Sequence, residues 1–188
     1  TMTIPVGALI NWMPNPSVET GVEWYTDAGP FFGEADGGIV SFTQTTDDKY
    51  FGQNALKCTI EPNINYGQDT AALSIVATDQ LPFTGYVFVA GYDIVGFTAV
   101  APSPSVGDNL SYSIYIKAGP HFVGRNAALV SFSGTDYSAP TVLTGDWQRL
   151  TLVTAPEVTG GTDNGAFIVV VEWDGGTGLT DIGQSLYL

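Results

Sequence analysis

The stretch Asn11–Gly21 reads NWMPNPSVETG, and Trp24 follows shortly after it. Pro14 and Pro16 each lack a backbone donor, and each restricts the residue before it to extended backbone. A strand that enters this stretch therefore cannot continue through it. We expect the chain to leave its first strand here and to turn, with Glu19 at the start of the next extended segment.

Outward from this stretch, the apolar patterns predict strands. In residues 110–117 (LSYSIYIK), larger apolar side chains alternate with Ser, Tyr and Lys, which indicates a strand buried on one face. Residues 166–173 (AFIVVVEW) are nearly all apolar and predict a central strand buried on both faces. No window carries the i, i+3, i+4 spacing of a helix. We expect strands at residues 7–13, 21–26, 37–45, 54–61, 70–77, 85–95, 109–118, 126–132, 147–155, 165–174 and 182–187.

The composition fits a β-rich domain. Hydrophobic residues make up 44% of the 188 residues, and 23 glycines and 11 prolines are spread along the chain, as in many short strands joined by turns. We therefore expect one all-β domain over residues 1–188, a two-sheet antiparallel β-sandwich. Cys58 is the only cysteine, which excludes an intrachain disulfide, and its strand-like surroundings predict a buried core thiol.

The charge balance excludes two classes of partner. Five Lys and Arg stand against 19 Asp and Glu, for a net charge of −14. Nucleic-acid binding needs a basic footprint that neutralises phosphates, so we expect no nucleic-acid partner. Anionic membranes are disfavoured for the same reason, and the longest apolar-rich run, residues 86–102, is too interrupted to insert in a membrane.

The opening stretch resembles the N-terminal signature of carbohydrate-binding-module-like, galactose-binding-like jelly rolls, which typically read N-L-x-x-N-P-S-F-E-x-G with a Trp shortly after. Val18 stands where this signature has an aromatic residue. Further segments match the same family in the same order, namely residues 49–57 (KYFGQNALK), 106–118 (VGDNLSYSIYIKA), 145–150 (GDWQRL) and 180–188 (TDIGQSLYL). The resemblance implies a jelly-roll sandwich.

The resemblance also implies a structural Ca²⁺ ion, which many members of this family hold between an acid on the first strand and one on the last. The matching residues are Glu19 and Asp181, while Gly183 stands where a second acid is common. Ca²⁺ takes six to eight oxygen ligands. Free ion at 100 times its Kd would stabilise the fold by about 2.7 kcal/mol, so EDTA would lower the melting temperature.

Aromatic side chains are the candidates for ligand binding, because sugars pack on aromatic rings in grooves lined by a few polar groups. Most of the four Trp, nine Tyr and ten Phe must lie in the core. Trp24 and Trp147 match family positions that are usually structural. The candidates in loops are Tyr25, Phe31, Phe32, Tyr66 and Tyr137. The alternative for all of them is that they anchor their loops to the core.

The sequence gives little support for catalysis. A Ser-His-Asp triad could use only His121, the sole histidine, and no G-x-S-x-G elbow accompanies it. H-E-x-x-H, Walker and G-x-G-x-x-G motifs are absent from the sequence. Carboxylate pairs at glycosidase spacing would arise by chance among so many acids. We therefore expect a non-catalytic domain.

Two functions stay open from the sequence. The first is a virion-surface domain of a phage tail, fibre or capsid decoration, which acts in assembly or adhesion and contacts other virion proteins or cell-surface glycans. The single cysteine and the absence of a signal-peptide pattern fit this function, and virion symmetry would make a homo-oligomer. The second is an extracellular carbohydrate-binding accessory module of a secreted glycoside hydrolase.

Overall fold

A computed structural model describes residues 18–19, 25–26, 40–61, 86–92, 110–131, 137–154, 167–172 and 181–188. These residues are rich in strands and contain almost no helix. The strands are β1 (Tyr25–Thr26), β2 (Val40–Thr45), β3 (Ala55–Ile60), β4 (Tyr86–Tyr92), β5 (Leu110–Ala118), β6 (Asn126–Ser131), β7 (Thr141–Val142), β8 (Gln148–Thr154), β9 (Phe167–Glu172) and β10 (Ser185–Tyr187), with one 3-10 turn, η3 (Pro120–Phe122), between β5 and β6.

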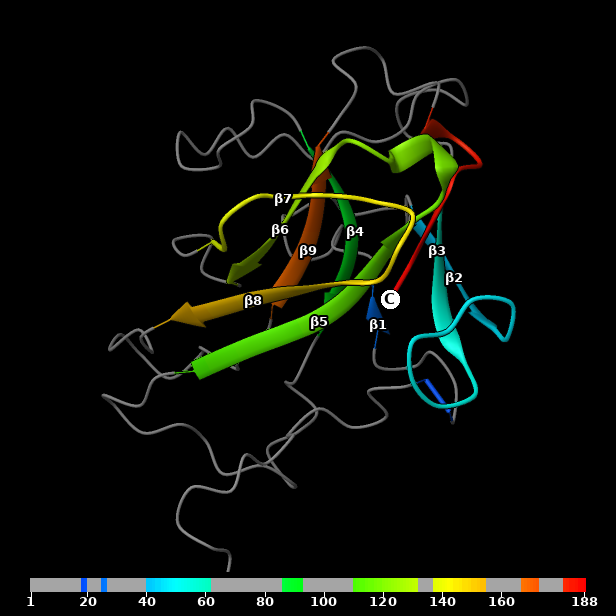
Figure 1. Ribbon diagram of the computed structural model, residues 1–188, viewed down its shortest axis with the longest axis horizontal. Coiled ribbons are helices and arrows are strands. Elements are labelled where there is room, and N and C mark those ends of the chain that lie inside the picture. The colour runs from blue at the N-terminus through cyan, green and yellow to red at the C-terminus, as the bar shows by residue number, and fades with distance from the viewer. Residues whose placement is uncertain are drawn as a thin grey trace, which may run out of the picture.

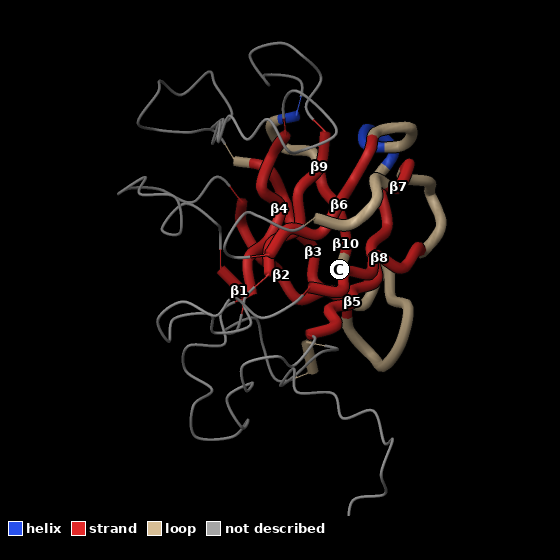
Figure 2. The backbone as a smooth tube through the Cα atoms, turned by 90° about the vertical axis from the view of Figure 1, so that its left-hand side faces the viewer, coloured by secondary structure: helices blue, strands red, loops and turns tan. Residues whose placement is uncertain are grey.

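The strands form two five-stranded sheets that pack face to face (Figures 1 and 2). The first sheet has the order β1-β4-β9-β6-β7, and the second has the order β2-β3-β10-β5-β8. Every strand pairing described within these two sheets is antiparallel. The chain crosses repeatedly from one sheet to the other, as in a jelly roll. The predicted all-β, two-sheet antiparallel β-sandwich is therefore confirmed.

The two strand patterns that carried the sequence prediction are both confirmed. In β9, Val169, Val170 and Val171 are fully buried, because this strand lies in the middle of the first sheet between β4 and β6. In β5, Ile114 and Ile116 are buried while the alternate residues are half-buried or exposed, because one face of the second sheet meets the core. The spacing of apolar residues along a strand therefore indicates whether one face or both faces of that strand are covered.

Two elements within the described ranges were not predicted, β7 and η3. Each is two or three residues long, which is too short to show a period of either kind. No helix in this part of the chain is long and apolar enough to cross a membrane. The strands predicted at residues 7–13 and 70–77 lie outside the described residues, and the prediction of a single domain over the whole chain stays a prediction.

The core lies between the two sheets, and both contribute to it. Phe122, Leu56, Leu129 and Leu186 are among its fully buried side chains. Burying side chains of this size stabilises the fold by about 1.5–3 kcal/mol each. Cys58 of β3 belongs to the same core and is fully buried, as predicted, and its burial raises the pKa of the thiol far above its ordinary value.

Candidate functional site

The outer face of the second sheet carries a patch of alternating cationic and aromatic side chains. Tyr187 of β10 pairs directly with Lys57 of β3 on one side and with Lys117 of β5 on the other. Two residues along β5, on the same face, Tyr115 pairs with Arg149 of β8. Directly opposed residues of an antiparallel pair have Cβ atoms about 5 Å apart, so these five side chains form one continuous patch across four strands.

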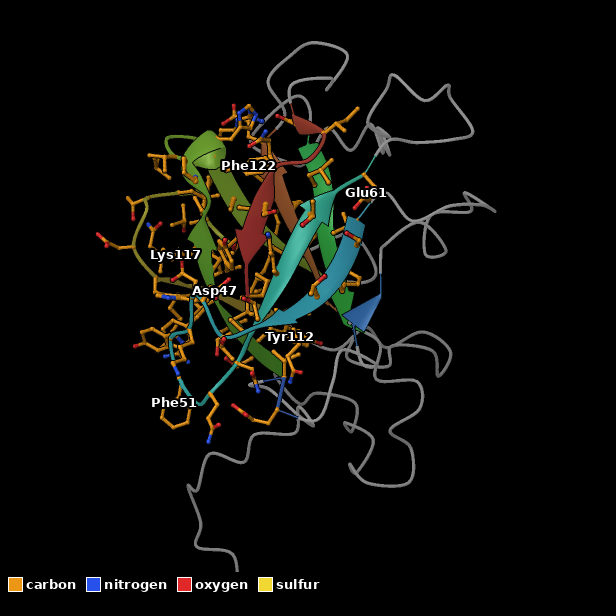
Figure 3. The ribbon with its side chains drawn as sticks, turned by 90° about the vertical axis from the view of Figure 1, so that its right-hand side faces the viewer. Asp47, Phe51, Glu61, Tyr112, Lys117 and Phe122 are labelled. Atoms are coloured by element: carbon orange, nitrogen blue, oxygen red, sulfur yellow. The ribbon has the colours of Figure 1, made fainter. Side chains whose placement is uncertain are left out.

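The loop of residues 46–54, which connects β2 to β3, brings a further ring onto this patch; we call it the aromatic loop. The ring of Tyr50 stacks on Tyr115, with centroids 3.9 Å apart and an interplanar angle of 23°. Trp147 lies beside Tyr50 at 5.9 Å and 51°. Tyr50 is 51% exposed and Phe51, which projects from the loop in Figure 3, is 79% exposed. We call Tyr50, Tyr115 and Trp147 the aromatic platform.

Two carboxylates hold the aromatic loop in place. Lys117 donates a hydrogen bond to Asp48 across 2.7 Å, which ties the first half of the loop to β5. At the other end, Glu19 Oε1 accepts hydrogen bonds from the backbone N–H of Gln53 at 2.6 Å and of Asn54 at 3.3 Å. Its Oε2 accepts from the Asn54 side chain at 2.9 Å. The loop is therefore fixed on both sides of Tyr50 before any ligand arrives.

The turn that presents Trp147 is also held by a side chain. Gln148 Oε1 accepts a hydrogen bond from the backbone N–H of Thr144 at 2.7 Å, and Gln148 Nε2 donates to the carbonyl of Val142 at 2.9 Å. Both bonds span the connection between β7 and β8. Gln148 thereby closes the turn immediately beside the indole, and the third ring of the platform has a fixed support.

Tyr50 and Tyr115 interact through their hydroxyls as well as through their rings. The hydrogen bond with Tyr115 raises the pKa of Tyr50 above its ordinary value of 10.0, and the negative charge that Tyr115 would itself carry adds to this effect. The neutral form of Tyr50 is therefore the one that the stack favours. Tyr50 therefore presents an uncharged phenol at physiological pH.

The backbone that positions Glu19 is strained at the residue before it. Val18 has a φ of 54°, in the left-handed region, which costs a β-branched L-residue about 1–2 kcal/mol. The side chain of Val18 is buried in the core, and its carbonyl accepts a hydrogen bond from the side chain of Gln44. The core contact and this hydrogen bond offset the strain. Val18 thus fills a core position, and the next residue reaches the aromatic loop.

A second cluster of charged groups lies at the opposite end of β3 and is centred on a buried carboxylate. Asp181 is fully buried, and Arg125 donates to both of its carboxylate oxygens, at 3.0 Å and 2.9 Å. His121 Nε2 lies 2.6 Å from Asp181 Oδ1 and 2.8 Å from Arg125 Nη2, so the imidazole contacts both members of the pair. The guanidinium of Arg125 also lies 5.0 Å from the ring centroid of Phe122. The cluster fastens η3 and β6 to the segment that leads into β10.

The structure does not bring the two predicted calcium ligands together. Glu19 binds the chain at Asn54, just before β3, whereas the turn after Asp181 is bonded to Ile60, the last residue of β3. Six residues of strand separate these points, which is about 20 Å. Among the described residues no group of three His, Cys, Asp or Glu side chains lies close enough to hold a metal ion. A calcium ion in this domain stays a prediction.

The predicted ligand-binding aromatics do not form a common site where the structure describes them. Tyr25 is in β1 at one edge of the first sheet, and Tyr137 is bridged to Val130 of β6 near the other edge, with β4 and β9 between them. Tyr137 is 41% exposed. Phe31, Phe32 and Tyr66 lie outside the described residues. Neither of the two described candidates belongs to the aromatic platform, which is on the second sheet.

The platform residues carried sequence signals that would have selected them. Tyr115 alternates with serine and lysine on the polar face of the predicted strand, where an aromatic side chain has no core to enter. Tyr50 and Phe51 are adjacent aromatics next to Gly52, whose φ of 79° is the conformation of a tight turn. Aromatic side chains on a polar strand face and in a turn are the combination that marks this surface.

Neither a family model nor a curated protein matches the chain. Similar solved structures include the CBM22-1 xylan-binding domain from Paenibacillus barcinonensis Xyn10C, with 14% identity, coverage of 80% of this chain and 78% of that one, and a TM-score of 0.43. A family 16 carbohydrate-binding module has 13% identity, 94% coverage of both chains and a TM-score of 0.46. The C-terminal family 22 module of Clostridium thermocellum Xyn10B has 14% identity, coverage of 91% and 85%, and a TM-score of 0.46. All three are carbohydrate-binding modules, the class of domain that the sequence motifs resemble.

Proposed function

We propose that this domain is a non-catalytic carbohydrate-binding module that binds a glycan on the outer face of its second sheet. The observation that carries the proposal is the aromatic platform, in which the half-exposed ring of Tyr50 stacks on Tyr115 beside Trp147. The apolar face of a sugar ring packs on such a surface. Because the platform is held by hydrogen bonds in the free protein, binding costs little conformational entropy.

Polar groups for sugar hydroxyls surround the platform. Ser113 lies on the same face of β5 and accepts a hydrogen bond from Arg149 at 3.0 Å. Farther along the sheet, the hydroxyls of Thr59 and Ser185 are 2.9 Å apart and half-buried. The patch crosses β3, β10, β5 and β8, three inter-strand spacings or about 15 Å. This length suits an oligosaccharide segment better than a single sugar.

The cysteine, the histidine and the carboxylate beside the platform have structural contacts, which supports binding rather than catalysis. The thiol of Cys58 is buried, and its raised pKa keeps it protonated. His121, the sole histidine, contacts Asp181 and Arg125, and within the described residues no serine hydroxyl is hydrogen-bonded to its ring. Asp48, next to the platform, is paired with Lys117.

An accessory module attached to a carbohydrate-active enzyme is the setting that a glycan-binding face suits most directly, and it would place the domain outside the cell. A phage virion-surface domain that adheres to cell-surface glycans would use the same face. The virion role and a homo-oligomer stay predictions from the sequence, because nothing in the described surface concerns a particle or a second copy.

Affinity electrophoresis through gels that contain single polysaccharides tests the proposal. We expect at least one polysaccharide to retard the wild type, and Tyr50→Ala to bind it about tenfold more weakly, as for a central aromatic residue of an interface. Val123→Ala, an exposed apolar residue after η3, is the matched control and retains wild-type retardation. Tyr137→Ala tests, in the same gels, the residue on the first sheet that the sequence predicts to bind the ligand. If no polysaccharide retards the wild type, or if Tyr50→Ala is retarded equally, the proposal fails.

A further inference from the structure

We infer that the ligand of this face is an acidic glycan, whose sugar rings carry carboxylates. The inference rests on the proposed function and names the chemical class of its ligand. The observation behind it is the distribution of cationic side chains, which are scarce in a chain with five Lys and Arg and 19 Asp and Glu. All five cations lie in the described residues. Three of them, Lys57, Lys117 and Arg149, belong to the patch, and Lys49 precedes Tyr50 of the aromatic platform in the loop.

Grouping these cations on one face does not stabilise the fold. Lys57 and Lys117 both flank Tyr187 and are two strand spacings apart, about 10 Å, so their charges repel each other weakly. Lys49 follows Asp47 and Asp48 in the chain and Lys117 is paired with Asp48, whereas no carboxylate among the described residues forms an ion pair with Lys57 or Arg149. A bound anion is the partner that such a grouping fits.

Three of the four cations are available to a ligand. Lys117 is neutralised by Asp48, whose contact holds the aromatic loop. Across the ranges that the structure describes, no carboxylate forms an ion pair with Lys49, Lys57 or Arg149. Lys49 is next to Tyr50 in the loop and is exposed. Within the part of the chain that the structure describes, the positive charge beside the platform therefore exceeds what the contact with Asp48 neutralises.

Arg149 is the cation best placed to select a carboxylate. It lies directly opposite Tyr115 on the neighbouring strand and is exposed, and one of its N–H groups donates to Ser113 at 3.0 Å. Its remaining N–H donors can bind both oxygens of a carboxylate. A uronic acid combines the two features that this pair recognises, because its ring has an apolar face and its carboxylate projects from the ring edge. Stacking on the platform would bring the carboxylate toward the guanidinium.

The number of charges also separates an acidic glycan from nucleic acid. Three unpaired cations suffice for a few carboxylates, one on each sugar. A nucleic acid places a phosphate at every nucleotide and needs a much larger basic footprint. Of the acids at the aromatic loop, Asp48 is paired with Lys117 and Glu19 accepts hydrogen bonds from Gln53 and Asn54.

The test uses one polymer in two charge states. Polygalacturonic acid and its carboxyl-reduced form share their linkages and differ in the carboxylate. Binding of the full chain is measured by titration calorimetry with EDTA present, which prevents calcium gels. We expect the acidic polymer to bind about tenfold more tightly than the reduced one. The double variant K57Q/R149Q should lose about fivefold on the acidic polymer and nothing on the reduced polymer, as two partly exposed charge contacts would.

Two further arms keep this inference separate from the proposed function. Tyr50→Ala should weaken both polymers alike, because stacking does not depend on charge. E61Q, which changes a half-buried acid outside the patch, is the charge-changing control and should leave both affinities unchanged. Equal binding of both polymers, or no loss in K57Q/R149Q, would overturn the acidic specificity and leave glycan binding intact. Tighter binding of dextran sulfate than of either polymer would overturn the carboxylate class. No binding of any of the three polymers would overturn the acidic glycan, and the gels with other polysaccharides would then decide the proposed function.

Discussion

The two ends of β3 carry two cation–carboxylate contacts that differ in burial. At the platform end, Lys117 and Asp48 have side chains that are 23% and 28% exposed. At the other end, Arg125 is 16% exposed and Asp181 is fully buried, with His121 completing its contacts. The distances are alike, at 2.7 Å and 2.9 Å, so geometry alone does not separate them.

Burial decides what each contact does. A buried carboxylate cannot return to water when its partner is removed. Removing either member of the Arg125–Asp181 pair therefore strongly destabilises the fold. A partly exposed pair keeps access to water, and contributes about 0–1 kcal/mol. We therefore regard the cluster around the buried Asp181 as a brace of the sandwich. The Lys117–Asp48 pair instead holds a loop in the shape that a ligand needs.

The largest expected effect comes from breaking the brace. Arg125→Met removes both hydrogen bonds to Asp181 and should lower the free energy of unfolding by about 3–5 kcal/mol, because a buried carboxylate loses its main partner. Lys117→Met, the matched change at the exposed pair, should cost no more than about 1 kcal/mol. Urea denaturation measures both. Similar losses in the two variants would contradict the assignment of different roles.

Thermal melting addresses calcium. If an ion holds the sandwich together, EDTA lowers the melting temperature of the wild type, as the resemblance predicts. A brace made by Arg125 alone gives the same melting temperature with and without the chelator. The comparison is cleanest in the wild type, in which the contacts of Asp181 are intact.

A smaller effect on stability is expected at Glu19. Glu19→Ala removes the acceptor for two backbone N–H groups and one side chain of the aromatic loop, and it should lower the free energy of unfolding by about 1 kcal/mol, because the groups are exposed to water. Glycan affinity should fall more than stability, because the loop then pays to become ordered on binding. Glu19→Gln retains an acceptor oxygen, so its stability and its glycan affinity should lie between those of the wild type and Glu19→Ala.

The pKa of Tyr50 shows whether Glu19 positions the aromatic loop or only adds to the stability of the fold. If Glu19 positions the aromatic loop, Glu19→Ala also loosens the stack and lowers the pKa of Tyr50 toward its ordinary value. Unchanged Tyr50 titration together with unchanged glycan binding would show that the loop does not depend on Glu19.

The smallest expected effect is the pH dependence of the stack. The folded protein raises the pKa of Tyr50, so it stabilises the neutral phenol. This contribution is fully present below the unfolded pKa of about 10 and is lost as the pH rises through the folded pKa. Tyr115→Phe removes the hydrogen bond and should lower the pKa of Tyr50 toward 10.0, which ultraviolet absorbance titration of tyrosinate measures. A titration of Tyr50 that is unchanged in Tyr115→Phe would show that the two hydroxyls do not interact.

Local information was enough for most of the described strands and insufficient for the site. The run at Val169–Val171 and the alternation in β5 are periods within single segments, so the sequence alone predicts both the strands and their covered faces. The platform instead joins Tyr50, Tyr115 and Trp147 from separate segments. Their contact depends on the path of the aromatic loop over the sheet, which no period encodes.

The resemblance was informative about which residues matter and less so about their partners. It selected Glu19 and Asp181, and both have several hydrogen bonds in the structure. Their partners are the aromatic loop in one case and Arg125 and His121 in the other. Such partners depend on which segments meet in space, and Arg125 in particular belongs to none of the matching motifs.

Labelling of the single cysteine can report how often this sandwich opens. Cys58 lies in β3, between β2 and β10, with its thiol fully buried and its pKa raised by that burial. A thiol reagent therefore reaches it only when the two sheets separate. The labelling rate at increasing reagent concentration reports the opening equilibrium first and the opening rate at the limit. The labelling rate of Cys58 thus measures how often the sheets separate, and this can be done in the wild-type sequence.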